Sequence, residues 1–336
     1  MPKITVLMSV YNGEKFLAEA IDGILNQTFR DFEFLIINDG STDGSRGIIQ
    51  SYKDPRINLV DNESNIGLTA SLNRGLRLAG GEYIARQDAD DVSLPGRLEK
   101  QISILERNRE IALLGSWYLE IDEGGNPLRE YKLPCEPLQI SWDSIFYCSF
   151  STVVFRRELV LNYAGPYDES FRYAQDWELY SKIARTLTVV NIGECLAKYR
   201  LHSRSMTDTY GSVVQSEIDR IRTMNIGYYV GLDPSRKNED YYRIAGNMHS
   251  MLFMDGKNLR HEDLAAAAGE IVGLYSAFSA KHGLDRKQSG ANLAKIYLKI
   301  AGVYAARHDI PETARYIART FGIDRSVFFS DLTLSV

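Results

Sequence analysis

Short apolar runs alternate with amphipathic stretches in the first quarter of the chain. The β-branched run at residues 4–10 predicts a buried strand, and the apolar positions of residues 14–27 recur at helical spacing. A second buried strand is predicted at residues 32–37 and further strands at residues 57–60 and 83–86, and a helical pattern follows the first two of these three. Strands that alternate with helices are typical of an α/β domain, in which helices flank a mostly parallel sheet.

The pattern changes further along the chain. A helix is predicted at residues 177–185. Around it, strands are predicted at residues 111–117, 151–155, 187–192 and 196–199. Strand signals then become rare, and apolar positions such as Leu293, Ile296 and Ile300 follow helical spacing. We therefore predict an α/β domain over residues 1–210 and a helical C-terminal appendage over residues 211–336.

Composition excludes several classes of protein. The 336 residues are 44% hydrophobic and 25% charged, as is usual for a globular protein with a substantial core. A formal net charge of -5 argues against nucleic acid as a partner, because nucleic-acid binders usually carry a basic face. The three cysteines lack metal-site spacing and the first residues lack a signal-peptide pattern, so we expect a cytoplasmic protein with reduced thiols.

Polar clusters follow three of the predicted strands. Tyr11 and Asn12 follow the first strand, Asp39 follows the second, and Asp88 and Asp90 follow the fourth. In parallel α/β sheets, ligands bind in the crevice outside the carboxyl ends of the strands, so we expect these clusters to converge. The carboxylates of Asp88 and Asp90 offer the hard oxygen ligands that Mg²⁺ or Mn²⁺ prefers. The alternative for this pair is a solvated acidic turn.

Four further side chains could carry chemistry, each beside a plain structural alternative. Tyr11 could stack on a base, or be a surface tyrosine at a turn. Asp39 could accept the N3–H of uracil or thymine, or cap a turn. Asp176 could act as a general base on an acceptor hydroxyl, or complement a helix N-terminus. His202 could be a third metal ligand or a phosphate contact, or a polar loop histidine.

Taken together, these stretches resemble family 2 glycosyltransferases. The matching segments, in the order and spacing of that family, are residues 6–12 (VLMSVYN), 36–43 (IINDGSTD), 65–67 (NIG) and 81–91 (GEYIARQDADD). Members that build bacterial cell-surface polysaccharides are also similar at residues 94–101 (LPGRLEKQ), 175–178 (QDWE) and 199–202 (YRLH). The resemblance covers residues 3 to 205.

The resemblance implies the A-type glycosyltransferase fold and an inverting transfer that needs Mn²⁺ or Mg²⁺. A hexosyl or N-acetylhexosaminyl group would move from a nucleotide-diphosphate donor, with UDP the family-based expectation, to a glycan or lipid-linked acceptor. Residues 1–210 would bind the nucleotide sugar and carry out catalysis. Asp176 would be the catalytic base, and Asp90, Asp88 and His202 would hold the metal. The implied donor-binding residues are Ser9, Tyr11, Asn12, Asp39, Asn65, Gly67, Arg86 and Asp88.

The sequence departs from the family pattern at two positions. Asn38 stands where an aspartate is common, and we expect base recognition to survive because Asp39 is retained. Gln175 stands where a glutamate often precedes the base, which would alter acceptor activation. Two other functions stay open at this point. One is a catalytically degenerate nucleotide-binding module; the other is a sugar nucleotidyltransferase, although residues 10–14 lack the basic glycine-rich loop that such enzymes carry.

The C-terminal region is compatible with two interpretations. Basic and aromatic residues near its end could touch anionic lipid at the inner face of the plasma membrane. They are Arg307, Arg315, Arg319, Tyr304, Tyr316, Phe321, Phe328 and Phe329. We favour a packed helix with a solvated basic face. Self-association through this region is also open.

Overall fold

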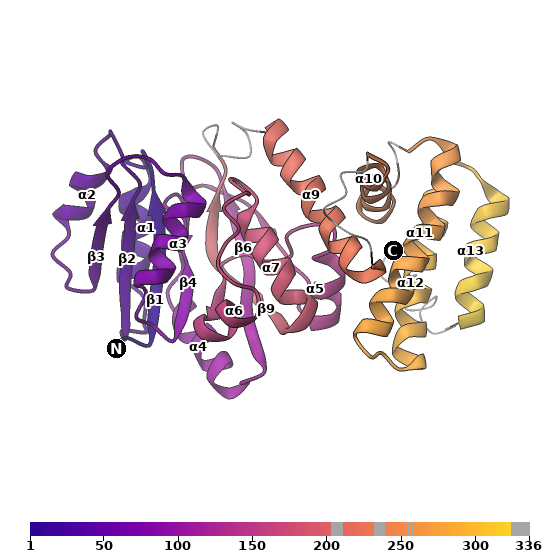
Figure 1. Ribbon diagram of the computed structural model, residues 1–336, viewed down its shortest axis with the longest axis horizontal. Coiled ribbons are helices and arrows are strands. Elements are labelled where there is room, and N and C mark those ends of the chain that lie inside the picture. Colours follow the sequence, from indigo (N-terminus) through magenta and orange to yellow (C-terminus); the bar gives the residue numbers. More distant parts are fainter. Residues whose placement is uncertain (203–210, 232–238, 255, 257–258, 324–336) are drawn as a thin grey trace. The chain divides into compact units, whose positions relative to one another are not determined.

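The computed structural model describes residues 1–202, 211–231, 239–254, 256 and 259–323 (Figure 1). The chain divides into two compact units, Met1–Ile218 and Asp219–Val336. The strands of the first unit are β1 (Ile4–Val10), β2 (Phe32–Asn38), β3 (Ile57–Asp61), β4 (Tyr83–Arg86), β5 (Val92–Ser93), β6 (Ile111–Ile121), β7 (Pro127–Tyr131), β8 (Val154–Arg156) and β9 (Thr188–Arg200). Its helices are α1 (Leu17–Leu25), α2 (Ser45–Ser51), α3 (Leu68–Leu78), α4 (Arg97–Arg107), α5 (Pro137–Asp143), α6 (Arg157–Tyr163) and α7 (Gln175–Thr186).

These strands form one sheet within the described residues. Its order is β3-β2-β1-β4-β8-β6-β9-β5, with β7 paired to β6. The predicted parallel arrangement is confirmed for the first four strands. Strand β1 lies between β2 and β4, and β3 pairs with β2 as the edge strand. The second half is mixed, because β8 is antiparallel to β4 and β6 whereas β9 runs parallel to β6.

Helices cover both faces of the sheet, as the apolar patterns require. Alternate residues of β1, such as Ile4 and Val6, pack in one cluster with apolar residues of α1 and α4. Leu7 belongs to a second cluster, which contains residues of α3 and α7. Because successive side chains of a strand point to opposite faces, a strand with almost every position buried must be covered on both sides.

The region predicted as two strands, residues 187–192 and 196–199, forms the single strand β9. Its pairing with β6 shifts register between Ser116 and Trp117, whose partners are Ile192 and Cys195. The extra residues that include Gly193 form a bulge, which interrupts the apolar pattern without ending the strand. Sequence periodicity alone therefore divided one long strand into two.

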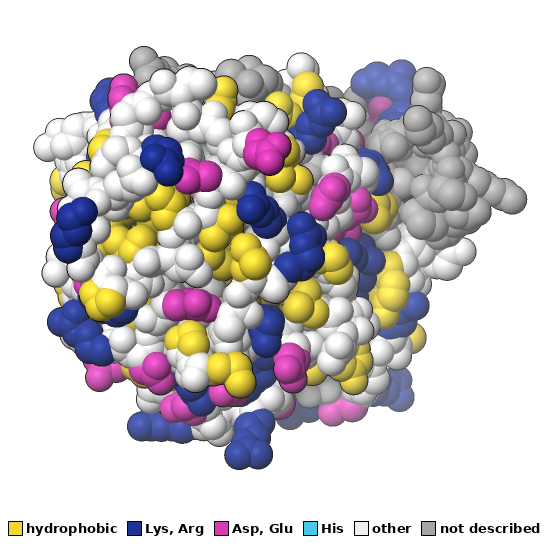
Figure 2. All heavy atoms as spheres, turned by 60° about the vertical axis from the view of Figure 1, so that its left-hand side comes forward, with side chains coloured by type: hydrophobic (Ala, Val, Ile, Leu, Met, Phe, Trp, Pro, Cys, Tyr) yellow, Lys and Arg dark blue, Asp and Glu magenta, His cyan; other side chains and the backbone are white. Residues whose placement is uncertain are grey.

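The face that carries α2 and β3 has a mixed surface. Figure 2 shows Lys and Arg side chains interspersed with Asp and Glu over this face, with hydrophobic side chains scattered between them. Arg46 of α2 pairs with Asp61 of β3 at 3.0 Å. Neighbouring opposite charges of this kind are consistent with the small net charge of -5.

Helices follow the sheet, as predicted. They are α9 (Gly211–Val230), α10 (Glu239–Phe253), α11 (His261–Lys281), α12 (Arg286–Ala305) and α13 (Ile310–Ile323). A capping box starts α12, where Gln288 N donates to Asp285 Oδ1 at 2.8 Å and the Gln288 side chain accepts from Asp285 N.

The aromatic residues near the end of the chain support the packed-helix interpretation where they are described. Tyr304 and Tyr316 are 2% and 5% exposed, and their rings stack at 5.6 Å. Arg307 Nη2 donates to the carbonyls of Gly256 and Leu259. Tyr304, Tyr316 and Arg307 are therefore engaged in contacts within the helical unit. Among the other residues of that hypothesis, Phe328 and Phe329 lie outside the described residues.

Candidate active site

The candidate site lies where β1, β2 and β4 end. In the parallel registers, Val10 is opposite Asn38 and Leu7 is opposite Arg86. The next residues continue this alignment, since Asp39 N donates to Val10 O at 2.8 Å. The convergence that the sequence predicts for the strand ends is therefore confirmed.

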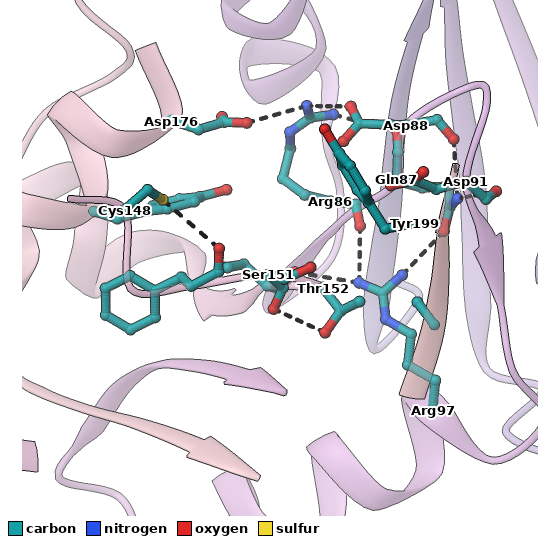
Figure 3. A pocket seen from close by; sticks show the side chains of 14 residues that line it. Arg86, Gln87, Asp88, Asp91, Arg97, Cys148, Ser151, Thr152, Asp176 and Tyr199 are labelled. Carbon is teal, nitrogen blue, oxygen red and sulfur yellow. Dashed lines mark hydrogen bonds and ion pairs between the residues drawn. The ribbon is translucent and has the colours of Figure 1, made fainter. Parts of the chain in front are cut away.

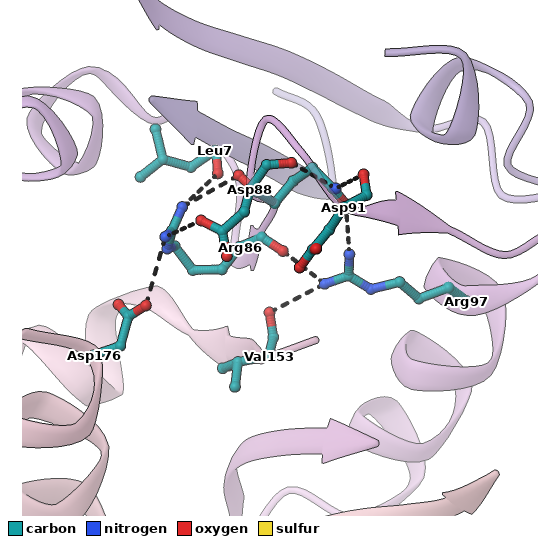
Figure 4. A network of polar contacts seen from close by, with 8 residues as sticks. Leu7, Arg86, Asp88, Asp91, Arg97, Val153 and Asp176 are labelled. Carbon is teal, nitrogen blue, oxygen red and sulfur yellow. Dashed lines mark hydrogen bonds and ion pairs between the residues drawn. The ribbon is translucent and has the colours of Figure 1, made fainter. Parts of the chain in front are cut away.

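The acid loop, residues 86–93, is held in shape by the buried guanidinium of Arg97. Arg97 is the first residue of α4 and is 1% exposed. Its Nη2 donates to Arg86 O at 2.8 Å (Figure 4). Its Nη1 donates to Gln87 Oε1 at 3.0 Å and to Ser93 Oγ at 2.8 Å. Gln87 Nε2 donates in turn to Asp91 O at 2.8 Å. A single side chain thus fixes both ends of the loop.

Arg86 lies between the carboxylates of Asp88 and Asp176. Its Nη2 lies 2.8 Å from Asp88 Oδ1 and 3.6 Å from Asp176 Oδ2 (Figures 3 and 4). The Arg86 side chain is 5% exposed. Because a buried cation needs compensating charge, Arg86 ties the acid loop to the start of α7.

Asp176 is the second residue of α7 and keeps one oxygen free. Within the described part of the chain, its Oδ1 is buried and has no hydrogen-bond partner. Burial raises the pKa of Asp176, while the positive charge of Arg86 works to lower that pKa. A carboxylate with a raised pKa and an unused oxygen is suited to accept a proton near neutral pH.

Asp90 and His202 form the third part of the site. His202 Nε2 lies 3.0 Å from Asp90 Oδ2, and the His202 side chain is 8% exposed. The neighbouring Asp91 accepts from Arg200 N at 3.0 Å. Burial, together with the charges of Asp90 and Asp88, raises the pKa of Asp91 well above its usual range. Negative charge is therefore crowded at this point.

A cavity of 230 Å³ opens between the acid loop and α7. Three of the predicted site residues line it, namely Arg86, Asp88 and Asp176 (Figure 3). The remaining lining residues are Gln87, Asp91, Arg97, Cys148, Phe150, Ser151, Thr152, Val153, Tyr180, Ala197 and Tyr199. Charged and amide groups gather at the acid loop, whereas the 148–153 segment adds apolar groups and two hydroxyls, and such a mixed lining is usual for a small-molecule site.

Asp39 is already engaged by the protein. It is 2% exposed, and its Oδ1 accepts from Asn62 Nδ2 at 2.7 Å and from Ile66 N at 2.9 Å. Its Oδ2 accepts from Gly67 N at 2.9 Å. Asp39 therefore fixes the 65–67 turn and retains acceptor capacity only at Oδ2. The turn comes so close that a Cβ at Gly40 would lie 2.6 Å from Asn65 N.

The other residues predicted to bind the donor differ in whether their side chains are exposed or already hydrogen-bonded within the protein. Asn12 Oδ1 accepts from Thr42 N at 2.8 Å, so this amide joins two turns. Tyr11 is 50% exposed. Asn65 Oδ1 accepts from Gly67 N at 3.0 Å, and Ser9 lies in β1. The structure therefore brings these residues to one edge, where Tyr11, Asn12 and Asn65 are exposed.

The departure at Asn38 has a physical reason. Its Nδ2 donates to Asp61 Oδ1 at 2.8 Å, and its Oδ1 accepts from Ser41 N at 3.2 Å. An aspartate at position 38 would place a second carboxylate against Asp61. The amide removes this repulsion.

Sequence reasoning missed three residues that shape the site. Arg97 and Tyr199 line the cavity, and Glu217 of α9 binds the backbone just before α7. Arg97 and Tyr199 lie in the segments 94–101 and 199–202 that resemble the family, but neither was given a role there. Arg97 also shares the buried face of α4 with Leu98 and Ile102, where an arginine is rare unless it has partners.

The acid loop fits a divalent cation in its donor chemistry. Two carboxylates and an imidazole are suitable ligands for Mn²⁺ or Mg²⁺, and a cation would relieve the crowding of negative charge at Asp91. Within the described residues, no three His, Cys, Asp or Glu side chains are already gathered as a metal site. Mg²⁺ sites commonly use only one or two carboxylates, with substrate phosphates as further ligands. The residues present are therefore sufficient.

Comparison with known proteins decides the family. The model of Glycosyl transferase family 2 matches residues 5–163. An uncharacterized glycosyltransferase of Haemophilus influenzae is 34% identical over 69% of this chain and 76% of its own length. Another from Methanocaldococcus jannaschii is 37% identical over 72% of this chain and 82% of its own length. The chain is a family 2 glycosyltransferase.

Other relatives of this glycosyltransferase have more specific names. The UDP-Glc:alpha-D-GlcNAc-diphosphoundecaprenol beta-1,3-glucosyltransferase of Escherichia coli is 27% identical over 65% of this chain and 89% of its own length. S. aureus TarS 1-349 in complex with UDP-GlcNAc has a TM-score of 0.57 at 17% identity, over 94% of this chain and 90% of the TarS 1-349 segment. The Pyrobaculum calidifontis mannosyltransferase in complex with GDP-Man and Mn²⁺ has a TM-score of 0.53 at 16% identity, over 95% of this chain and 86% of the mannosyltransferase chain. These likenesses establish the A-type fold of this enzyme.

Among the described residues of the glycosyltransferase, no helix is both long enough and apolar enough to cross a membrane.

Proposed function

We propose that this glycosyltransferase moves a sugar, with inversion, from a UDP donor to a glycan or lipid-linked glycan in a reaction that depends on Mn²⁺ or Mg²⁺. The observation that carries the proposal is the free oxygen of Asp176. This oxygen is buried and unpaired within the described chain, and its residue lines the cavity next to the acid loop. An acceptor hydroxyl would satisfy it.

The chemistry follows from this geometry. An acceptor hydroxyl donates to Asp176 Oδ1 and passes its proton to that oxygen as the hydroxyl oxygen attacks the anomeric carbon. The bond from that carbon to the UDP oxygen breaks on the opposite side, so the configuration inverts without a covalent enzyme intermediate. Arg86 favours the ionised form of Asp176, which is the form that can accept the proton.

Asp88, Asp90 and His202 are the residues that would hold the metal. A bound Mn²⁺ or Mg²⁺ supplies neutralisation of the negative charge on the departing diphosphate. For Asp90 the supporting contact is its 3.0 Å pairing with His202. For Asp88 the supporting observation is that its side chain is 49% exposed. Arg86 donates to Asp88 Oδ1, which leaves Oδ2 for the cation.

A uridine nucleotide is the donor that the comparisons favour. TarS was solved with UDP-GlcNAc, and the E. coli relative is named for UDP-Glc, whereas the P. calidifontis enzyme was solved with GDP-Man. Tyr11 is exposed enough to stack on a base, and Asp39 Oδ2 keeps capacity for a base N–H. We assign these two residues to base recognition, and Ser9, Asn12, Asn65 and Gly67 to the surrounding donor surface.

The acceptor and cellular setting follow the same reasoning. A polyprenyl-diphosphate glycan, as in the name of the E. coli relative, would bring the enzyme to the inner face of the plasma membrane during cell-surface polysaccharide synthesis. We assign donor binding and catalysis to residues 1–210. Residues 211–336 are assigned to acceptor selection, membrane-surface contact or self-association.

Two experiments test the proposal. Calorimetric titration with UDP, dTDP and GDP, each with Mn²⁺ and then with EDTA, should show UDP binding that is lost on chelation. Turnover with UDP-glucose, UDP-galactose, UDP-N-acetylglucosamine and GDP-mannose, using a GlcNAc-diphospholipid acceptor, should select a UDP-sugar.

Asp176→Asn should keep the affinity for UDP and lower kcat by at least about 100-fold, because a base acts only in the chemical step. An equal loss of UDP affinity and turnover would make Asp176 a binding or structural residue instead.

A further inference from the structure

The segment that leads into α7 determines where Asp176 lies. Residues 164–174 connect α6 to α7, and Asp176 follows only two residues later. The first turn of α7 receives no help from its own cap, because Ala174 makes no side-chain capping hydrogen bond. The position of Asp176 therefore depends on what holds this connecting segment.

Two side chains of α3 hold the early part of the segment. Asn73 Oδ1 accepts from Tyr167 N at 3.0 Å, and Asn73 Nδ2 donates to Tyr167 O at 2.9 Å. Thr69 Oγ1 donates to Phe171 O at 2.6 Å. Both α3 residues are about 5% exposed or less, so these bonds are shielded from water.

Glu217 of α9 holds the last three residues of the segment. Its Oε1 accepts from Arg172 N at 2.8 Å, and its Oε2 accepts from Tyr173 N and Ala174 N, both at 2.9 Å. Glu217 is 8% exposed. The three N–H groups are consecutive, so one carboxylate fixes the backbone directly before the first turn of α7.

This arrangement is more specific than ordinary packing. A buried carboxylate is costly unless it is fully hydrogen-bonded, and bonds to a charged acceptor are shorter and stronger than neutral ones. The negative charge also lies next to the N-terminus of α7, where the helix dipole favours it. The Glu217 side chain lies within the first compact unit and comes from a helix that begins 37 residues after Ala174, the last residue it fixes.

We propose that Glu217 is a positioning residue for sugar transfer: its carboxylate fixes the 172–174 backbone and thereby sets Asp176 in the cavity. Glu217 touches neither substrate nor the reacting atoms and acts through Asp176. This inference rests on the proposed role of Asp176 as the base.

The test is Glu217→Gln in the full-length enzyme, assayed with the UDP-sugar that turns over fastest in the donor panel. Glutamine has nearly the same size, but its amide NH₂ must face at least one of the three N–H groups. We expect kcat to fall about 10- to 100-fold, since a displacement of about 1 Å can cost that much. The Kd for UDP with Mn²⁺ should stay within about twofold of wild type, because the donor contacts are not altered.

The matched control is Glu33→Gln. Glu33 Oε1 also accepts a backbone N–H, from Gly80 at 2.7 Å, together with the hydroxyl of Thr5. It lies near the start of β2, whereas the site lies at the carboxyl ends of the strands. This variant should lose a comparable structural contact and keep the kcat of wild type.

A double variant separates positioning from general stability. If Glu217 acts through Asp176, E217Q should lower the residual rate no further in the D176N background. Effects that multiply, or a parallel fall in UDP affinity, would overturn the proposal. Wild-type kcat in E217Q would also overturn it. Wild-type turnover in D176N would be a different failure, since it would remove the base role on which this proposal rests.

A second pair of variants covers the case in which E217Q does not fold. Thr69→Val removes the bond to Phe171 O on the other side of the same segment, and Thr69→Ser retains the hydroxyl. We expect the valine variant to lower kcat at unchanged UDP affinity and the serine variant to restore it. Equal kcat in all three proteins would contradict the role of this segment.

Discussion

Replacing Arg86 by Met should alter the pH dependence of sugar transfer. Arg86 Nη2 lies 3.6 Å from Asp176 Oδ2, and its positive charge works to lower the pKa of Asp176 against the effect of burial. Without this charge the pKa of Asp176 rises further, so a higher pH is needed to ionise the base. The acidic limb of the pH–rate profile should therefore move to higher pH.

The size of the effect follows from the separation of the charges. Two unit charges at this distance attract by about 4–5 kcal/mol at an effective dielectric constant of about 20. The Asp176 side chain is 32% exposed, so solvent screening reduces this attraction. We take the screened attraction between Arg86 and Asp176 as about 2 kcal/mol. Its loss in Arg86→Met corresponds to about a 30-fold lower rate than wild type on the acidic limb.

The assay is kcat against pH, between about pH 5 and 9, for wild type, Arg86→Met and Arg86→Lys. Lysine keeps the charge, so its acidic limb should stay near that of wild type. Circular dichroism and UDP titration check that each variant folds and binds. If the acidic limb of Arg86→Met coincides with that of wild type, then either Asp176 is not the base or Arg86 does not control its ionisation.

Two further predictions concern the acid loop. Asp90→Asn should weaken Mn²⁺-dependent binding of UDP at least about tenfold and leave metal-free binding unchanged, because the cation loses an anionic ligand; an unaltered titration with Mn²⁺ would exclude Asp90 as a ligand. Arg97→Met should lower the free energy of unfolding by about 3–5 kcal/mol, since it leaves the buried acceptors of the acid loop without their donor. Arg107→Met, at the exposed end of the same helix, should cost less than about 0.5 kcal/mol; equal midpoints in urea would show that the Arg97 bonds contribute little.

The sequence sufficed for the parts of the fold that local patterns encode. Strands β1, β2 and β4 are buried at almost every position, so each reads as a short apolar run that ends in polar residues, whereas the edge strand β3 is partly exposed. Parallel pairing then brings their carboxyl ends together, which places Asp39 and Asp88 at one edge. Strand β9 was harder to predict, because its bulge at Gly193 breaks the apolar run within a single strand.

The contacts within the site could not be read from the sequence. Nothing local shows that Asp39 is enclosed by Asn62, Ile66 and Gly67, since these partners lie in the next strand–helix connection. Glu217 is a similar case. In the sequence it looks like any other glutamate of a helix, and only the folded chain brings it to the backbone before α7.

The central claim is tested most directly by the configuration of the transferred sugar. The enzyme would be incubated with an α-linked UDP-sugar from the donor panel, Mn²⁺ and a GlcNAc-diphospholipid, and the anomeric proton coupling of the product measured by NMR. We expect a β-linked product from wild type and at least about 100-fold slower product formation from Asp176→Asn. An α-linked product, or equal product from the two proteins, would contradict it.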